Sequence, residues 1–157
     1  DGGHEVIYTA VVNSIDNVLG DGVAATNPYP TFNDFRTAVS DRKVNGAFRS
    51  GWQPDYPSAE NYLVQNFASA AADGNGSNDG DYKNPEFDAL CDKAAASKSV
   101  ADANKLYQQA QEVLLNDLPA VPLYYANAYG VASTGVSGFE MNWQNLPVYE
   151  NMTKSGK

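Results

Sequence analysis

The strongest pattern in this sequence is an amphipathic helix that starts after Ser99. Ser99 and Asp102 have the spacing of a helix N-cap, in which the serine hydroxyl accepts a backbone N–H of the first turn. The apolar residues that share one helical face are Ala103, Leu106, Tyr107, Ala110, Val113 and Leu114. A helix with one apolar face must pack it against another element. The pattern therefore predicts a fold with a compact core, and 157 residues suffice for about one domain.

A second helix is expected near the start of the chain. The residues of segment 5–19 that share one helical face are Ile7, Val11, Ser14, Ile15 and Val18. Gly20 follows this segment as a C-terminal cap. Because residues 5–12 are rich in β-branched side chains, they also suit a strand, and both interpretations stay open.

Capping residues mark three further helix starts. Thr31 and Ser58 are suitable N-caps, and Asn84 is followed by Pro85, a residue favoured at the first helical position. The helix after Thr31 is expected to end near Lys43. Its buried side is predicted to consist of Phe32, Phe35 and Val39.

Short strands are predicted between the helices. Residues 44–52 and 120–126 have strand composition, and residues 23–26 suit a short extended segment. Pro122 lacks a backbone N–H and therefore suits an edge or an end of a sheet. Residues 69–81 contain no apolar side chain larger than alanine, so a surface loop or hinge without a core is expected. The alternation predicts an α/β fold with parallel pairing in part.

Composition and charge exclude several functions. The chain has 10 Lys and Arg against 19 Asp and Glu, a net charge of −9, so a surface that neutralises nucleic-acid phosphates is not expected. Cys91 is the only cysteine, which leaves no internal disulfide, and its position on an apolar helix face predicts a core residue. His4 is the only histidine. No apolar run reaches the length of about 20 residues that crosses a bilayer. We predict no metal and no cofactor.

The densest group of candidate binding residues lies at residues 51–57. Trp52, Gln53, Asp55 and Tyr56 present an indole, an amide, a carboxylate and a phenol within one turn after a predicted strand. In open α/β sheets, ligands bind outside the carboxyl ends of strands. Asp55 could pair with a ligand ammonium, and the aromatic rings could cover apolar ligand surface. The alternative is that both rings belong to the core and that Asp55 closes a turn.

Patterns that would indicate an enzyme or a calcium site are less specific. Asp73, Asp79 and Asp81 lie in a stretch rich in Gly and Asn, but they lack the alternating acidic spacing and the final Glu of a calcium loop. Asp55 and Glu60 could form a carboxylate pair for glycoside hydrolysis. Chance pairs of this kind are common in an acidic chain, so neither pattern identifies a site.

Four segments, taken in order, resemble one protein family. They are residues 51–57 (Gly-Trp-Gln-Pro-Asp-Tyr-Pro), 61–63 (Asn-Tyr-Leu), 82–88 (Tyr-Lys-Asn-Pro-Glu-Phe-Asp) and 118–125 (Leu-Pro-Ala-Val-Pro-Leu-Tyr-Tyr). In order and spacing they resemble the C-terminal part of the oligopeptide- and dipeptide-binding proteins of ABC importers, the extracellular solute-binding proteins of family 5. The resemblance covers residues 2–125 and continues more weakly through the tail.

The resemblance implies one lobe of a two-lobed, periplasmic-binding-protein-like fold of type II, with helices packed on a short mixed sheet. Residues 1–125 would form the second ligand-binding lobe. Residues 126–157 would pack on a first lobe that is absent from this chain. The two lobes would close on the ligand by a hinge movement. An isolated lobe is then expected to bind its ligand weakly, because half of the cleft is missing.

The resemblance also implies a function without catalysis, the capture of oligopeptides as the substrate-binding component of an importer. Asp55 would bind the peptide α-ammonium and Trp52 would line the same pocket. Gln53 would be a neighbour, and Tyr56 completes the predicted ligand-binding set. The protein would be a monomer outside the cytoplasm, periplasmic or anchored as a lipoprotein, with permease subunits as partners. An oligosaccharide or another solute is the alternative ligand, and a hydrolase or a calcium-dependent adhesion module is less favoured.

Overall fold

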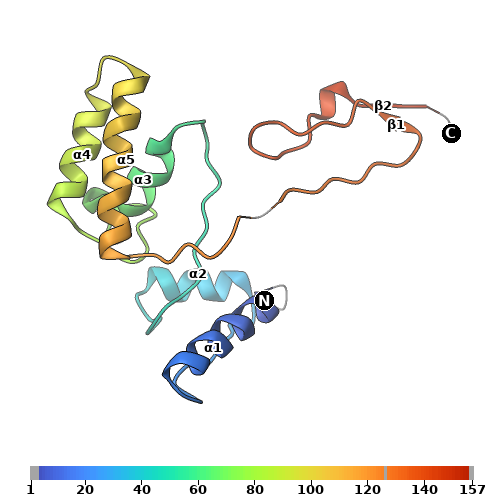
Figure 1. Ribbon diagram of the computed structural model, residues 1–157. Helices are drawn as coiled ribbons and strands as arrows, with labels where there is room; N and C mark the ends of the chain where they lie inside the picture. Colours follow the sequence, from blue (N-terminus) through green and yellow to red (C-terminus); the bar gives the residue numbers. More distant parts are fainter. Residues whose placement is uncertain (1–3, 126, 156–157) are drawn as a thin grey trace. The chain divides into compact units, whose positions relative to one another are not determined.

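The computed structural model describes residues 4–125 and 127–155 of the chain. Among these residues the α-helices are α1 (Glu5–Leu19), α2 (Phe32–Ser40), α3 (Ala59–Phe67), α4 (Pro85–Ala95) and α5 (Val100–Asp117) (Figure 1). The shorter elements are the 3₁₀ helices η2 (Ser69–Ala71) and η3 (Tyr149–Asn151) and the strands β1 (Val136–Ser137) and β2 (Thr153–Lys154). No helix in the described ranges combines the length and the apolar character needed to cross a membrane.

Side-chain caps explain where the predicted helices begin. The Thr31 hydroxyl accepts a hydrogen bond from the backbone N–H of Asp34 (3.1 Å), and the Ser99 hydroxyl accepts one from Asp102 (3.1 Å). Asn84 caps α4 in the same way, directly before its first-turn proline. The five predicted helices are confirmed, and α1 is a helix where the sequence also allowed a strand.

Helix α2 ends at Ser40 rather than near Lys43. Arg42 has a φ of 57°, a left-handed conformation that does not continue a right-handed helix. The N–H of Lys43 then donates to the carbonyl of Ala38 (2.8 Å), which satisfies one of the last carbonyls of the helix. The predicted end is therefore slightly too late.

The chain divides into two compact units, and the first, Asp1–Arg49, contains a small aromatic cluster around Phe35. The rings of Tyr29, Phe32 and Phe48 lie 5.8, 6.1 and 6.3 Å from the Phe35 ring, centre to centre. Val39 is buried as predicted, whereas Phe32 is 55% exposed and does not belong to the buried side. Helix α1 has no buried residue: Ile7 and Val11 on its predicted apolar face are half-buried, whereas Ile15 and Val18 are exposed.

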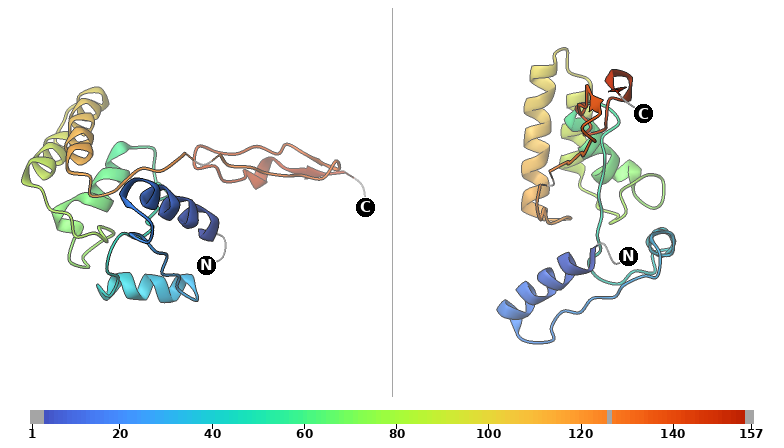
Figure 2. Two further views of the ribbon diagram at one scale, coloured as in Figure 1. Left: turned by 60° about the horizontal axis from the view of Figure 1, so that its bottom comes forward. Right: turned by 90° about the vertical axis from the view of Figure 1, so that its right-hand side faces the viewer.

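The core of the second unit, Ser50–Lys157, lies where α3, α4 and α5 meet. Helices α4 and α5 pack side by side, and α3 contacts both (Figures 1 and 2). The buried residues of this core are Leu63, Ala68, Phe87, Cys91, Ala94, Tyr107 and Ala110. The predicted core position of Cys91 is confirmed. Burial raises the pKa of its thiol to about 11, so the thiol is protonated at neutral pH.

Two residues of the loop at residues 69–81 are buried, although its composition predicts a surface loop without a core. Ala72 is fully buried and the Asn78 side chain is 1% exposed. The Asn78 Nδ2 donates to the carbonyls of Ala68 (3.1 Å) and Tyr82 (2.8 Å), and its Oδ1 accepts from the N–H of Tyr82 (3.1 Å). The expectation of a surface loop is wrong at these two positions, because one buried amide satisfies three backbone groups and ties the loop to the residues that flank it.

The predicted strands are not found in the described residues. Residues 44–52 and 120–125 contain no strand, and Ala126 lies outside the described residues. Within the described ranges, the sheet consists of β1 and β2, which pair antiparallel with Val136 opposite Lys154. The predicted mixed sheet with parallel pairing is therefore not confirmed. A segment with strand composition forms a strand only where a partner completes its ladder of hydrogen bonds, and neither segment has one in this structure.

The boundary between the two units lies between Arg49 and Ser50, inside the segment predicted to be a single lobe. Compactness within one chain does not identify a lobe of a larger protein. The assignment of residues 1–125 to a ligand-binding lobe, and of residues 126–157 to a segment packed on another lobe, therefore stays a prediction.

A group of polar side chains ties the start of α4 to the end of α5. The Oδ2 of Asp117 accepts hydrogen bonds from the Tyr82 hydroxyl (2.6 Å) and from the Nδ2 of Asn84 (2.7 Å). Burial, together with the bond to Asp117, raises the pKa of Tyr82 to about 12. The hydrogen bond from Tyr82 lowers the pKa of Asp117.

We expect this group to make the stability of the fold depend on pH at both extremes. The Asp117 contribution is complete above the ordinary carboxyl pKa and is lost as the pH falls through the lowered value. The Tyr82 contribution is complete below its ordinary pKa of 10.0 and is lost as the pH rises toward about 12. Urea unfolding at a series of pH values should show a shallower alkaline decline for Tyr82→Phe. Tyr125→Phe, at a fully exposed position, should leave the decline unchanged; equal declines in all three proteins contradict the assignment.

Candidate functional site

The predicted binding residues lie in a turn that Asn61 holds against α3. The Oδ1 of Asn61 accepts hydrogen bonds from the indole Nε1 of Trp52 (2.9 Å) and from the backbone N–H of Asp55 (2.9 Å). Its Nδ2 donates to the Oδ2 of Asp55 (3.4 Å). Asn61 is in the first turn of α3, which the Ser58 hydroxyl caps by accepting from the N–H of Glu60. The cap at Ser58 thus starts the helix that positions Asn61 to bond Trp52 and Asp55.

The two groups predicted to meet a ligand are accessible. Asp55 is exposed and Trp52 is half-buried, whereas the Asn61 side chain between them is 1% exposed. The indole is therefore held at its N–H edge, and the carboxylate is held through one of its two oxygens. This arrangement leaves carboxylate surface free to accept hydrogen bonds from a cation.

Tyr56 lies beside the turn and is linked to the following helix. Its hydroxyl donates a hydrogen bond to the carboxylate of Glu60, and this bond raises the pKa of Tyr56. The Glu60 carboxylate thus accepts a hydrogen bond from the phenol of Tyr56, four residues earlier in the sequence. That contact does not support the use of Glu60 with Asp55 as a pair for hydrolysis.

A second link connects the turn to the C-terminal tail. The Nε2 of Gln144 donates to the carbonyl of Pro54 (2.9 Å), and the Nε2 of Gln53 donates to the carbonyl of Gln144 (3.3 Å). The loop that carries Gln144 is itself fixed, because the Oδ1 of Asn142 accepts from the N–H groups of Gln144 (2.9 Å) and Leu146 (3.0 Å). The predicted neighbour Gln53 therefore contacts a tail residue that the sequence did not connect with the site.

The structure brings Trp52, Gln53, Asp55 and Tyr56 into one turn, and their roles in ligand binding stay predictions. Sequence reasoning did not assign a role to Asn61, although its segment is one of those that carry the resemblance. An Asn in the first turn of a helix, following a Gly-Trp-containing turn, was the available indication. Its burial and its partners became visible only in the tertiary structure.

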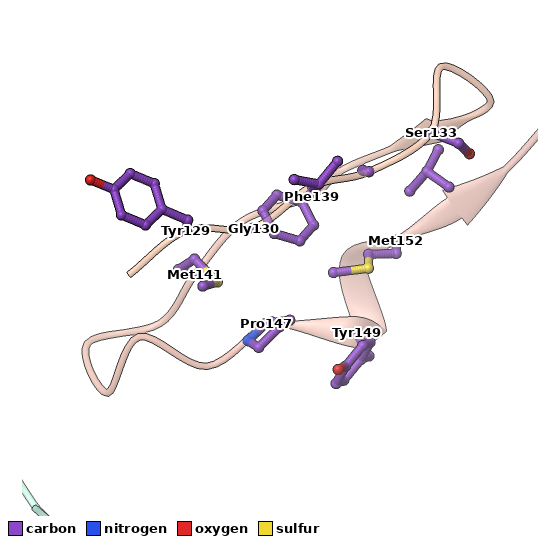
Figure 3. Close-up of a pocket in the computed structure, with 11 residues that line it drawn as sticks. Tyr129, Gly130, Ser133, Phe139, Met141, Pro147, Tyr149 and Met152 are labelled. Carbon is purple, nitrogen blue, oxygen red and sulfur yellow. The ribbon is translucent and has the colours of Figure 1, made fainter. Parts of the chain in front are cut away.

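A separate pocket of about 370 Å³ lies within the tail (Figure 3). Its lining includes Tyr129, Phe139, Tyr149 and both methionines, Met141 and Met152. The Phe139 ring lies directly against Gly130, where a β-carbon would collide with it (Figure 3). The tail therefore covers part of its own apolar surface, while Trp143 and Tyr149 remain 51% and 75% exposed.

The acidic stretch that invited comparison with a calcium loop has other contacts. Asp73 forms an ion pair with Lys83 (2.5 Å), and its backbone N–H donates to Asp81 (2.7 Å). In the described part of the chain, no three His, Cys, Asp or Glu side chains gather closely enough to hold a metal ion. The stretch is thus accounted for by contacts within the chain.

Comparison with known proteins gives the class of proteins to which part of this chain is related. No protein-family model matches the chain. Over part of its length, the chain is homologous to solute-binding proteins that include peptide-, dipeptide- and haem-binding members. The resemblance predicted from the four sequence segments is confirmed for that part.

Three comparisons define how far the likeness extends. Di/tripeptide-binding protein 4 of Pseudomonas aeruginosa is 35% identical over 92 residues, which are 59% of this chain and 17% of that protein. The probable deoxycholate-binding periplasmic protein YgiS of Escherichia coli is 28% identical over 94 residues, 60% of this chain and 17% of that protein. The structure of HbpA2 from Haemophilus parasuis matches 79% of this chain and 24% of that chain, with a TM-score of 0.54 and 23% identity.

These identities and coverages define what this chain shares with the three proteins. At 23% identity the HbpA2 structure shows a shared fold of helices with a small sheet. The chain matches about a sixth of the length of the two sequence relatives (17% of each). Both relatives are named as binding proteins and neither as an enzyme.

Proposed function

We propose that this chain is part of the substrate-binding component of an ABC importer and that it contributes to the capture of peptides outside the cytoplasm. The 35% identity to a di/tripeptide-binding protein supports a peptide ligand, and the name of YgiS supports an extracytoplasmic location. The structural observation that carries the proposal is the exposed Asp55 carboxylate beside the Trp52 indole, both hydrogen-bonded to Asn61.

The chemistry of this turn suits the free amino end of a peptide. An ammonium group can donate to the accessible Asp55 carboxylate, and a charge-assisted bond of this kind is about twice as strong as one between neutral groups. The half-buried Trp52 ring supplies apolar surface next to it. Gln53 and Tyr56 are already bonded to Gln144 and Glu60, so they act as neighbours of the site.

The C-terminal tail supports a position inside a larger protein. Tyr129 and Val131 are 83% and 96% exposed, which is unfavourable for such large side chains in water. We propose that residues 1–125 belong to a ligand-binding lobe and that the tail packs on a second lobe, with permease subunits as the further partners. A single protomer would carry the complete cleft.

A different solute is the second candidate, because the relatives differ in what their names say they bind. YgiS is named for deoxycholate, which has no ammonium group. A ligand without a cation would use the Trp52 ring and neutral hydrogen bonds, and Asp55 would be dispensable. The same experiment on Asp55 therefore separates the two candidates.

Asp55→Asn is expected to weaken binding of trialanine about tenfold and to leave binding of N-acetyl-trialanine nearly unchanged. The substitution removes one charge-assisted hydrogen bond, which is worth about 1.5–3 kcal/mol, and tenfold corresponds to about 1.4 kcal/mol. Titration followed by NMR of the backbone amides measures such weak affinities and identifies the residues in contact.

Glu112→Gln serves as the matched control, because Glu112 is an exposed carboxylate on α5 and does not belong to the turn at residues 51–57. It should leave both affinities unchanged. Equal affinities of the unsubstituted chain for the two peptides, or shifts that avoid residues 52–56, would contradict peptide capture through Asp55. A sugar or a bile acid whose binding is unaffected by Asp55→Asn would favour the second candidate.

A further inference from the structure

We propose that Asn61 is a positioning residue of the ligand site, and that it sets the preference for a free amino group by holding the Trp52 indole and the Asp55 carboxylate in one arrangement. This inference rests on the proposed function. Asn61 is itself 1% exposed and acts through the two residues that it holds.

The geometry links one amide to both groups. The Asn61 Oδ1 accepts from the Trp52 Nε1 and from the Asp55 N–H, each at 2.9 Å. The Asn61 Nδ2 donates to the side-chain carboxylate of Asp55, with 3.4 Å between Nδ2 and Oδ2. Asn61 therefore fixes the backbone of Asp55 and one of its carboxylate oxygens.

An amide is the side chain that this position requires. It must accept from two N–H donors with one atom and donate toward a carboxylate with another, and the amides of Asn and Gln do this with an oxygen that has two lone pairs and a separate NH2 group. Leu has the same branched skeleton, although it is larger, and it leaves two N–H groups without their acceptor. Asp keeps the acceptor but turns a like charge toward Asp55.

A buried Asn could also have a purely structural role, and the two roles predict different results. A structural residue changes the affinity for every ligand through the amount of folded protein. A positioning residue changes the ratio between a ligand that has the ammonium and one that lacks it. The ratio of the trialanine and N-acetyl-trialanine affinities is therefore the quantity to measure.

Asn61→Leu is expected to reduce this ratio from about tenfold to near one and to shift the Trp52 indole N–H resonance, because the bond to Oδ1 is lost. Asn66→Leu is the matched control in the same helix, since the Nδ2 of Asn66 donates to the carbonyl of Tyr62, four residues earlier in α3 (2.8 Å). It should preserve both the ratio and the resonance. An unchanged ratio in Asn61→Leu, with both affinities lowered equally, overturns the proposal.

Asn61→Asp tests the same idea if the leucine variant does not fold. In Asn61→Asp the side chain still accepts from the Trp52 Nε1 and the Asp55 N–H, but it no longer donates to the Asp55 Oδ2 and turns a like charge toward it. The ratio of the two affinities at neutral pH should therefore change, while the Trp52 indole N–H keeps its acceptor. An unchanged ratio overturns the proposal. Absence of any preference in the unsubstituted chain would instead contradict the proposed function.

Discussion

Phe87→Ala is expected to lower the free energy of unfolding by about 3–5 kcal/mol. Phe87 is fully buried among α3, α4 and α5, and its ring meets the Tyr82 ring at a steep angle, 6.0 Å between centres. Alanine would leave a cavity that the capped helices cannot close without breaking other contacts. This loss is a large part of the total stability of about 5–15 kcal/mol that a domain has.

Chemical unfolding followed by far-UV circular dichroism measures the loss. Leu115→Ala is a suitable control because Leu115 lies on the same core helix, α5, but is 59% exposed. A surface truncation of this kind should change the free energy of unfolding by about 0.5 kcal/mol or less. If Phe87→Ala costs no more than Leu115→Ala, the core does not lie where α4 and α5 meet.

Asn78→Leu is expected to cost about 2–4 kcal/mol, because a buried amide that satisfies three backbone groups is replaced by a side chain that satisfies none. The carbonyls of Ala68 and Tyr82 and the N–H of Tyr82 would lose their partner. Leucine has the same branched skeleton and is larger, so the cost comes from unsatisfied polar groups and from overpacking, and not from a cavity. The same unfolding experiment measures it.

Asn75→Leu provides the comparison within the same loop, since Asn75 is exposed. It should have little effect on stability. Asn78→Asp retains the acceptor for the Tyr82 N–H but loses both donations and buries a charge, so its stability should also fall well below that of the unsubstituted chain. Equal effects at positions 75 and 78 would show that the loop is not held by Asn78.

The core and the candidate site share helix α3. Leu63 belongs to the core and Asn61, two positions earlier, holds the turn with Trp52 and Asp55. A substitution that loosens the core therefore also disturbs the site. Binding experiments on Asp55 and Asn61 are best interpreted as ratios between two ligands, because a ratio does not change with the folded fraction.

Much of the helical structure could be predicted because its causes are local. The bond from Asp102 N–H to Ser99, like that from Asp34 to Thr31, forms between residues three apart, and the apolar spacing of α5 is visible in the sequence. The clustering of Trp52, Gln53, Asp55 and Tyr56 in one turn is equally local. These features need no information about distant residues.

The strands and the loop were predicted less well because their structure depends on partners. Residues 44–52 have strand composition but no partner strand to complete a ladder of hydrogen bonds. The two-residue strands β1 and β2 pair with each other although they lie far apart in the sequence, and composition does not indicate this pairing. Residues 69–81 look like a surface loop, yet Asn78 is buried by contacts with Ala68 and Tyr82.

The sequence by itself determined the helices, their caps and the set of side chains at the turn, because hydrogen bonds between near neighbours and helical periodicity act over a few residues. The tertiary structure alone decided that Asn61 holds Trp52 and Asp55, that Gln144 reaches Pro54 across the chain, and that Asn78 fastens a polar loop. The Gln144 contact joins residues 90 positions apart. The Asn61 and Asn78 contacts join residues 4 to 10 positions apart, but they depend on the burial of each amide by the packed helices, and no local residue pattern encodes that packing.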